Sequence, residues 1–288
     1  MAEPVDLLLI SWNRREYIEK TLRNLASSPE DFNLYCWDNG STDGAADIIA
    51  SCGDARIVEK HFCPINIMQA YPTQWFLEKS RSSIIGKLDD DTLVPSHWID
   101  LIAPAVYNHK ELGMIGCWTF RPDDFERNRE KALKKITRAG ACQILRNIWI
   151  GGTAFLMRKE LALRYVIADH NGRAFPIDRI RMSEDGFISG WYYPLIHAEH
   201  MDDPRSKHCL MNKPSGMGKQ SALTARVRGM RSPEQYQHWI MKDADEILSS
   251  TVSQQLKTIK YKKTVRYKLI QKIVQLIRIF NRENPCNE

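Results

Sequence analysis

Three consecutive aspartates, Asp89, Asp90 and Asp91, follow a predicted buried strand at residues 83–88. Neighbouring carboxylates repel one another, so a cation or several hydrogen-bond donors must compensate their charge. A hard divalent cation with oxygen ligands does this, and Mg²⁺ typically uses one or two carboxylates together with substrate phosphates. The run therefore indicates a site for a metal ion and a phosphorylated ligand. A solvated acidic turn or a helix N-terminus is the alternative interpretation.

A second acidic pair, Glu184 and Asp185, follows Ser183. These acids either begin a helix, where negative charge is favoured, or act in acid–base chemistry. Two histidines come next, His197 and His200, in a predicted strand at residues 193–199 and just beyond it. Residues three apart on a strand point to opposite faces, so at most one of them can face a given site, and an ordinary packed or surface histidine is the alternative.

The elements that must position these residues alternate between strand and helix. Strands are predicted at residues 5–11, 33–37, 56–59, 83–88, 148–157 and 193–199. Helices are predicted after Asn13, which would be an N-cap, and at residues 45–50, 66–79, 96–109 and from Ser183 onward. The helix at 66–79 is expected to be kinked at Pro72. The charged residues 121–146 are expected to form a helix or a surface excursion. This alternation predicts an α/β fold with right-handed βαβ units and a mostly parallel sheet. Ligands bind outside the carboxyl ends of such strands, where the polar clusters lie.

Composition excludes several classes of protein. The chain has 288 residues, 26% of them charged, and a net charge of +6, which is typical of a globular protein. Its seven cysteines form no CxxC pair, which argues against a disulfide framework, a zinc ribbon and an oxidising compartment. No apolar run reaches about 18 residues, and no signal peptide is recognisable. We therefore expect a cytoplasmic protein without a transmembrane helix.

Positive charge is concentrated in two segments. Residues 205–231 carry seven Lys or Arg and residues 256–282 carry nine, without an acid in either, so the rest of the chain is acidic. The first segment, with Lys219 and Arg226, is interpreted as a lid over a diphosphate or as a plain connector. The second is an amphipathic helical tail that binds an anionic membrane surface or packs on the domain. A domain at 1–232 and a basic helical extension at 233–288 are predicted.

The order of five motifs resembles the family-two inverting glycosyltransferases, whose GT-A fold binds nucleotide-diphospho-sugars. The matching segments are Ile10-Ser11-Trp12-Asn13-Arg14, Trp37-Asp38-Asn39-Gly40-Ser41-Thr42-Asp43-Gly44, Asp89-Asp90-Asp91 with Pro95 and Trp98 after it, Gly151-Gly152-Thr153 with Arg158-Lys159 after it, and Glu184-Asp185. Together they extend over residues 5 to about 200.

This resemblance implies a role for each matching residue. Donor binding would fall to Trp12, Asn13, Arg14, Asp38, Asn66, Asp89, Asp90, Gly151 and Gly152, with Asp38 accepting from the nucleobase. A divalent metal, Mn²⁺ or Mg²⁺, would be held by Asp91, with His200 as a further ligand. Asp185, next to Glu184, would be the general base that activates the acceptor hydroxyl. The acceptor would be a surface glycan or a lipid-linked glycan, with possible membrane contact through the basic tail.

The sequence also departs from the family. No glycine follows Asn66, and residues 186–188 lack the second acid usual after Asp185; Trp191 could stack on an acceptor sugar, although a large aromatic residue is more often in the core. A sugar-1-phosphate nucleotidyltransferase is an alternative, but residues 9–15 lack the glycine-rich loop of that class. A non-catalytic sugar-binding relative is another. A nucleic-acid-binding protein is not indicated, because no such module is present. An aspartyl phosphatase is disfavoured because Leu93 stands where Thr or Val is expected.

Overall fold

The computed structural model describes residues 3–168, 175–213, 223–262 and 269. Contacts between Cα atoms divide the chain into two compact units, Met1–Ser249 and Ser250–Glu288. The first unit contains both sheets and all of the candidate site residues. Each unit is described by itself.

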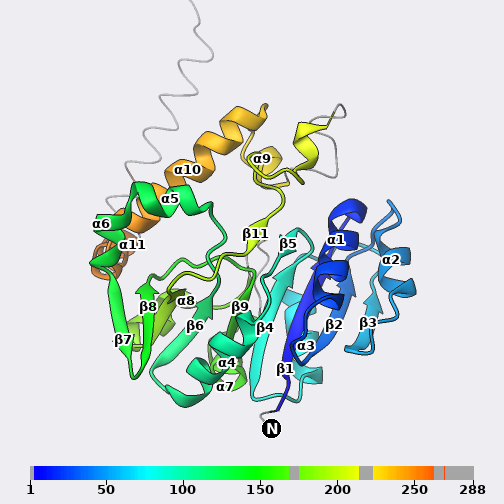
Figure 1. Cartoon of the computed structure of the whole chain (residues 1–288), viewed down its shortest axis with the longest axis horizontal. Coiled ribbons are helices and arrows are strands. Elements are labelled where there is room, and N and C mark those ends of the chain that lie inside the picture. Colours follow the sequence, from blue (N-terminus) through cyan, green and yellow to red (C-terminus); the bar gives the residue numbers. More distant parts are fainter. Residues whose placement is uncertain (1–2, 169–174, 214–222, 263–268, 270–288) are drawn as a thin grey trace, which may run out of the picture. The chain divides into compact units, whose positions relative to one another are not determined.

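The first unit is built on a nine-stranded sheet with the order β3-β2-β1-β4-β9-β6-β10-β8-β7 (Figure 1). Its strands are β1 (Val5–Ser11), β2 (Phe32–Asp38), β3 (Ile57–Phe62), β4 (Ile84–Asp89), β6 (Leu112–Gly116), β7 (Ile136–Ala139), β8 (Cys142–Arg146), β9 (Phe155–Arg158) and β10 (Ile188–Tyr193). A second sheet pairs the two short strands β5 (Thr92–Leu93) and β11 (Glu199–His200).

Most strands of the large sheet run in one direction. β1, β2, β3 and β4 are mutually parallel, and β10 is parallel to β6. β9 is antiparallel to both β4 and β6, and β8 is antiparallel to β10 and β7, so in this sheet only β9 and β8 oppose the rest. Ser11 lies beside Asp38, and Ile10 lies beside Asp89. The predicted mostly parallel α/β sheet is confirmed, and its polar strand ends meet at one edge.

Helices cover both faces of the sheet, which explains why β1 is apolar along its whole length. Leu7 and Leu9 pack toward one face, with helices α1 (Arg15–Ala26), α2 (Ala45–Ser51) and α4 (Trp98–Asn108). Leu8 and Ile10 pack toward the other, with α3 (Ala70–Lys79), α7 (Lys159–Tyr165) and α8 (Arg179–Glu184). Successive side chains of a strand alternate in direction, so a strand between two helical layers must be apolar at every position.

Several predicted elements differ from the structure; the strand predicted at 193–199, for example, is interrupted between Tyr193 at the end of β10 and Glu199 in β11. Residues 121–146 form α5 (Pro122–Arg127), α6 (Arg129–Leu133) and the edge hairpin β7–β8, which turns at Gly140 with φ +55°. The helix predicted at 66–79 begins at Ala70, so Pro72 lies in its first turn, where a missing N–H costs little. The strand predicted at 148–157 is confined to β9.

The first unit extends beyond the predicted boundary at residue 232. After η1 (Leu210–Asn212) and α9 (Leu223–Val227), helix α10 (Pro233–Ser249) packs on α5 and α6. Leu248 is fully buried, and Asp245 accepts from Arg127 at 2.8 Å. The boundary therefore lies at residues 249 and 250, because α10 supplies part of the core.

The second unit contains α11 (Val252–Lys262). Thr251 and Gln254 form a capping box at its start: the Thr251 backbone N–H donates to Gln254 Oε1 at 2.8 Å, and the Gln254 backbone N–H donates to Thr251 Oγ1 at 3.3 Å. Most of the predicted basic helix at 256–282 lies outside the described residues. In the part of the chain that the structure describes, no helix has the length and apolar character needed to cross a bilayer.

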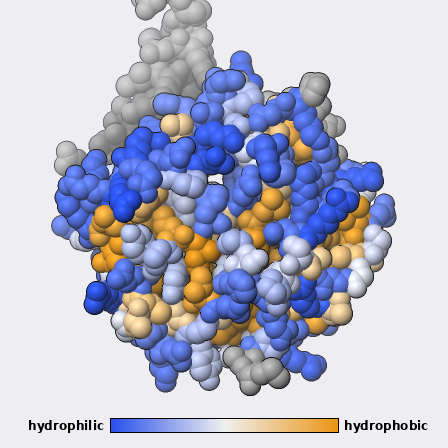
Figure 2. All heavy atoms as spheres, in the orientation of Figure 1, coloured by the Kyte–Doolittle hydropathy of each residue, from blue (hydrophilic) through white to orange (hydrophobic). Residues whose placement is uncertain are grey.

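Hydrophilic residues dominate the face in Figure 2, with hydrophobic patches between them.

Candidate functional site

A cavity of about 600 Å³ opens at the carboxyl ends of β1, β2 and β4. It brings together these predicted site residues: Trp12, Arg14, Asn66, Asp89, Asp90, Asp91 and His200. Its other lining residues are Ile10, Ser11, Asn39, Met68, Gln69, Leu223, Thr224, Val227 and Arg228. The location is the one at which open α/β sheets bind ligands. Asn13, Asp38, Gly151, Gly152, Glu184 and Asp185 are not among the lining residues.

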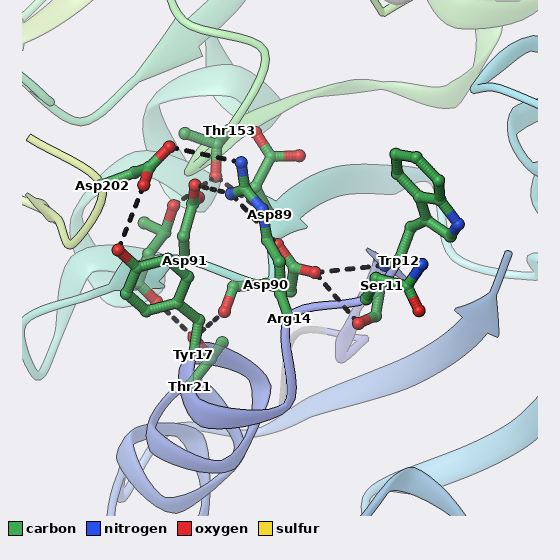
Figure 3. A network of polar contacts seen from close by, with 12 residues as sticks. Ser11, Trp12, Arg14, Tyr17, Thr21, Asp89, Asp90, Asp91, Thr153 and Asp202 are labelled. Carbon is green, nitrogen blue, oxygen red and sulfur yellow. Dashed lines mark hydrogen bonds and ion pairs between the residues drawn. The ribbon is translucent and has the colours of Figure 1, made fainter. Parts of the chain in front are cut away.

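Asp90 is tied back to the end of β1. Its Oδ2 accepts from Ser11 Oγ at 2.9 Å and from the Trp12 backbone N–H at 3.3 Å (Figure 3). Burial raises its pKa to about 7, with Asp91 and Asp89 adding to the rise and Arg14 opposing it. Asp90 therefore joins the ends of β1 and β4, and little of its side chain is exposed to the cavity.

Asp91 is held between two cationic groups. Its Oδ2 accepts from Arg14 Nη1, and His200 Nε2 lies 3.3 Å from the same oxygen. Although burial favours the neutral acid, Arg14 and His200 outweigh it and hold the pKa of Asp91 well below its usual value. Burial opposes the charge on His200, yet Asp91 raises the pKa of the imidazole to about 9.

Arg14 also joins two residues that the sequence analysis missed, Asp202 and Tyr17. Arg14 Nη2 lies 3.3 Å from Asp202 Oδ2, and Tyr17 donates to Asp202 Oδ1 at 3.1 Å (Figure 3). Tyr17 is a buried residue of α1, and in the sequence only its hydroxyl indicates a polar role. The Asp202-Asp203 pair, which follows His200 after Met201, was the signal available in the sequence.

Asp89 is connected to the glycine pair through Lys87, a buried lysine of β4. Lys87 Nζ contacts Asp89 and donates to Gly152 O at 3.0 Å. The Asp89 backbone N–H donates to Thr153 Oγ1 at 2.8 Å. Gly151 lies beside Thr119. The glycine segment is therefore held next to Asp89, although neither glycine lines the cavity.

Asp38 is the last residue of β2, and among the described residues only one of its two carboxylate oxygens accepts a hydrogen bond. Its Oδ2 accepts from the Ser41 backbone N–H at 2.8 Å, a contact that stabilises the turn after β2. Its Oδ1 is buried and has no hydrogen-bond partner among the described residues. A buried carboxylate oxygen without a donor is costly, so the atom is available to a ligand N–H.

Asn13 and Asn66 shape the loops around the cavity. Asn13 does not cap α1, which begins at Arg15 without a side-chain cap; instead its Oδ1 accepts from the Thr42 backbone N–H at 2.7 Å. Asn66 Oδ1 accepts from the Met68 backbone N–H at 2.8 Å. Met68 adopts φ +66°, a conformation for which glycine is usual. This explains how the loop turns without a glycine after Asn66.

Glu184 and Asp185 lie away from the cavity, contrary to prediction. They end α8 rather than begin a helix, and Gly186 follows with φ +94°, a common helix C-terminal signal. Strand β10 starts only at Ile188, beside Leu112 at the start of β6. Asp185 thus precedes the start of β10, toward the amino edge of the sheet, whereas the aspartate run follows the carboxyl end of β4.

Asp185 is engaged by α7. Tyr165 donates to its Oδ2 at 2.5 Å, and Arg164 Nη2 is 3.1 Å from the same oxygen. These contacts join the ends of two helices. Asp185 therefore has a structural role here, and the expected general base must be sought elsewhere.

Asp178 lies at the opposite end of α8. It caps the helix by accepting from the Arg181 backbone N–H at 3.0 Å. The next residue, Arg179, donates to Ile150 O at 2.6 Å, and Phe175 Cβ lies beside Gly152. The start of α8 therefore lies against the glycine segment that contacts Asp89. Sequence reasoning missed Asp178 because it took the later acids as the start of the helix.

His197 and Trp191 do not reach the cavity. His197 forms a bridge with Trp118, and burial lowers its pKa, whereas His200 lies opposite Thr92 and contacts Asp91. Of the two histidines, only His200 therefore lies at the cavity. Trp191 is completely buried against Trp118, so it cannot stack on an acceptor sugar.

The residues around Asp91 fit a divalent cation that is shared with a phosphate ligand. Two neighbouring ligands of an octahedral ion are about 3 Å apart, close to the 3.3 Å between Asp91 Oδ2 and His200 Nε2. Within the described ranges, no three His, Cys, Asp or Glu side chains are arranged to hold a metal by themselves. The remaining ligands would have to come from substrate and water, which is common for Mg²⁺.

Comparisons with known proteins give the family. The sequence profile of Glycosyl transferase family 2 matches residues 6–166. A search of curated protein sequences gives no significant match. The family match includes β1, β2 and β4, the three strands whose ends form the cavity.

Solved structures share the fold at low sequence identity. The mannosyltransferase PcManGT from Pyrobaculum calidifontis, in complex with GDP-Man and Mn²⁺, matches with a TM-score of 0.53 and 13% identity over 97% of this chain and 81% of that chain. S. aureus TarS 1-349 matches with a TM-score of 0.52 and 12% identity over 70% of this chain, which spans 61% of that one. The same fragment in complex with UDP-GlcNAc has a TM-score of 0.51, with 12% identity over 68% and 58% of the two chains. The sheet with its cavity, the matching structures and a family profile that extends over more than half of the sequence lead to one conclusion: the chain belongs to glycosyl transferase family 2 and has the GT-A fold.

Proposed function

We propose that the protein transfers a sugar, with inversion, from a nucleotide-diphospho-sugar to a hydroxyl group of a glycan. The observation that carries this proposal is the placement of Asp91 and His200, 3.3 Å apart, in a cavity at the carboxyl ends of β1, β2 and β4. Family membership supports the reaction class, and structures of the same fold hold GDP-Man or UDP-GlcNAc.

In this proposal, Asp91 and His200 hold a divalent metal, Mn²⁺ or Mg²⁺, beside the diphosphate. The PcManGT structure with Mn²⁺ supports such a site. The cation supplies Lewis-acid stabilisation of the negative charge on the departing diphosphate. Arg14 contacts the same Asp91 oxygen, so it must leave that oxygen when a metal binds. Its guanidinium then becomes available to the phosphate oxygens, for which its planar fork is well suited.

Asp38 is proposed to accept a hydrogen bond from the nucleobase through its unpartnered Oδ1. Trp12 and Asn66 form walls of the donor pocket, since both line the cavity. Figure 3 shows the Trp12 indole directed away from the network around Arg14, which leaves its ring free for a ligand. Asp89 and the adjacent Gly151–Gly152 segment would receive the ribose and the sugar.

Asp178 is proposed as the general base in place of Asp185. It lies on the end of α8 that contacts the glycine segment, through Arg179 and Ile150. A carboxylate there would take the proton of the acceptor hydroxyl as its oxygen attacks the anomeric carbon opposite the diphosphate. Asp178→Asn should lower kcat by 10²-fold or more, whereas Asp185→Asn should leave kcat nearly unchanged and lower stability. The reverse pattern would restore Asp185 as the base.

Helix α9 is proposed to close one side of the donor pocket. Thr224, Val227 and Arg228 line the cavity, which supports the lid that the basic segment 205–231 suggested. Lys219 lies outside the described residues, and Arg205 is used elsewhere, in ion pairs with Asp124 and Asp203. We expect Arg228→Met to raise the KM for the donor. An unchanged KM would mean that this side chain does not bind the donor and that α9 only lines the cavity.

The acceptor is proposed to be a surface or lipid-linked glycan, reached with help from the basic tail. The evidence for membrane contact is the charge of residues 256–282 alone, nine Lys or Arg without an acid. Co-sedimentation with anionic vesicles should be strong for the full chain and weak for a chain ending at Ser249. Equal sedimentation of the two chains would exclude this role for the tail.

A panel of UDP-, GDP- and dTDP-sugars tests the donor and the metal together. With Mn²⁺ or Mg²⁺, at least one donor should raise the Tm and be slowly hydrolysed. Asp91→Ala should abolish both effects. The matched control, Asp100→Ala, removes an exposed acid on α4 and should behave like the wild type. If no donor binds in the presence of metal, or if Asp91→Ala turns over normally, the proposed function is wrong.

A further inference from the structure

Arg179 is a largely buried arginine for which the described residues supply no acidic partner. Its Nη1 donates to Ile150 O at 2.6 Å, whereas its Nε is buried and has no hydrogen-bond partner in the described structure. Burial lowers its pKa, and no carboxylate in the described part of the chain offsets that effect. Four other arginines that are buried or half-buried each contact an acid: Arg14, Arg56, Arg158 and Arg205.

A guanidinium in such a place costs free energy, because burial removes water from a charge that no acid of the described residues neutralises. An anionic ligand would remove that cost. The planar fork of arginine donates two parallel hydrogen bonds to a carboxylate or a phosphate. The orphaned Nε supplies one of these donors in the geometry as it stands.

Trp149 lies next to this guanidinium. The carbon of the Arg179 guanidinium is 5.6 Å from the centre of the Trp149 ring, and 39% of Trp149 is exposed to solvent. Large aromatic side chains are usually buried, so an exposed one beside an unpaired cation points to a ligand. An indole face suits the apolar side of a sugar ring, and the guanidinium suits an acidic substituent on that ring.

The pair lies within reach of the reacting sugar. The segment that begins at Trp149 continues to Gly152, whose carbonyl accepts from Lys87, and to Thr153, whose Oγ1 accepts from the Asp89 backbone N–H. Four residues of chain span at most about 14 Å. Arg179 and Trp149 are therefore about one or two sugar units from Asp89, on the side of the glycine segment rather than among the residues that line the donor cavity.

We propose that Arg179 and Trp149 form an acceptor subsite that binds an anionic group, a carboxylate or a phosphate, of the acceptor glycan. Trp149 would stack on the sugar that carries the group or on its neighbour. This inference depends on the proposed function, because it names the chemical class of the acceptor for the same site. It predicts that neutral glycans are poor acceptors.

The test uses ¹⁹F NMR of the full chain labelled with 5-fluorotryptophan, in which Trp149→Phe identifies the Trp149 signal. The probes are methyl glucuronide, glycerol 3-phosphate and the neutral methyl glucoside. We expect the Trp149 signal to shift in a saturable way with at least one of the two anions, and not with the glucoside. The anion with the lower Kd distinguishes a carboxylate acceptor from a phosphate acceptor.

Variants separate binding from structure. Arg179→Met should raise the Kd for the anion about ten-fold or more, as expected for the loss of a charged hydrogen bond. The Kd of Arg179→Lys should lie between those of the wild type and Arg179→Met. Arg181→Met is the matched control, since Arg181 is an exposed arginine on the same helix over the Tyr165 ring, and it should bind like the wild type. If Arg179→Met does not fold, the Arg179→Lys variant still reports on the geometry of the fork.

Three results would overturn the subsite: an equal shift with methyl glucoside, no shift with either anion, or wild-type affinity in Arg179→Met or Arg179→Lys. Binding of a nucleotide sugar in the presence of Mn²⁺ is measured on the same samples. Donor binding without anion binding refutes the subsite and leaves the proposed function standing. Failure to bind any donor refutes the function, whatever the anions do.

Discussion

At the scale of single residues, the carboxylates of the site differ in their partners although they are neighbours in sequence. Asp90 is buried against the end of β1, and burial raises its pKa to about 7. Asp91 faces Arg14 and His200, which keep its pKa low. Side-chain direction and partners therefore give the adjacent acids different tasks: one joins strands and one presents a charge to the cavity.

Asp38 gives a prediction on donor recognition. Asp38→Asn keeps the turn contact to Ser41 but can replace the free carboxylate oxygen with an N–H, so we expect about ten-fold weaker binding of the preferred nucleoside diphosphate. Isothermal titration calorimetry measures the change. The control is Asp43→Asn, which alters an acid of the same loop that contacts the Arg15 backbone. Equal affinities in both variants would remove Asp38 from the nucleobase site.

Lys135 gives a prediction on stability and pH. Burial lowers its pKa to about 8, and its Nζ donates to Ile247 O at 2.6 Å. Between about pH 8 and 10.5 the unfolded chain binds more protons at this lysine, so the free energy of unfolding should rise with pH in that window. Below it, the cost of burying the charge is fully present.

Urea denaturation at pH 7.5 and pH 10 measures the effect. Lys135→Met should be insensitive to this titration, so the stability of the wild type relative to the variant should increase by on the order of 1–3 kcal/mol at the higher pH. Lys134→Met removes an adjacent exposed lysine paired with Glu130 and should retain the wild-type pH dependence. A constant difference between the wild type and Lys135→Met would mean that the buried amine does not titrate there.

At the scale of elements, helix direction decides which acids meet the site. Helix α8 carries Asp178 at its start and ends at Glu184 and Asp185, and only its start contacts the glycine segment. The helix has six residues, so its two ends are about 9 Å apart. A short element can thus place one acid toward the carboxyl edge of the sheet and another at the amino edge.

Arg205 ties the loop after β11 to α5. It contacts Asp124 at 2.8 Å and Asp203 at 2.7 Å, and Asp124 is completely buried. Although burial opposes it, Arg205 and Arg127 lower the pKa of Asp124. Arg205→Met leaves a buried charge short of a partner, so we expect the free energy of unfolding to fall by about 3–5 kcal/mol in urea denaturation.

The control for that prediction is Arg129→Met. Arg129 pairs with Glu126 on the exposed side of the same region, and such surface pairs contribute about 0–1 kcal/mol. A loss in Arg205→Met no larger than in this control would show that the loop holds its position without the ion pairs.

At the scale of the whole molecule, the basic extension predicted at residues 233–288 is divided between the two compact units. Helix α10 belongs to the first unit, where Tyr236 and Ile240 pack with Met211 and Ala225, and α9 carries Ala225 beside the cavity. Residues 250–288 form the second unit. The positive charge of the tail and the donor cavity thus belong to separate units.

Truncation tests this boundary. A chain ending at Ser249 should keep the Tm of the full chain and its donor binding. A chain ending at Ser232 loses the buried Tyr236, Ile240 and Leu248, so its Tm should fall by on the order of 10 °C or more, with weaker donor binding because α9 loses its support. Differential scanning fluorimetry compares the two. Equal Tm values would return the boundary to residue 232.

The sequence by itself determined the fold class, the family and the aspartate run, because these are written in local patterns. Continuous apolar strands such as residues 5–11 indicate burial on both faces, and turn-rich polar segments after them indicate the strand ends that bind ligands. The edge hairpin at 136–146 was missed, since its short strands lie in a highly charged segment and depend on pairing with β10.

Only the tertiary structure decided which polar residues meet. Asp185 was predicted to be catalytic from its place in the motif order, yet Gly186 ends its helix and the strand register puts it at the wrong edge of the sheet. Asp202 and Tyr17 reach Arg14 from segments 185 residues apart in the chain. A local pattern fixes the direction of a backbone, but long-range packing fixes the distance between side chains, and a reaction depends on that distance.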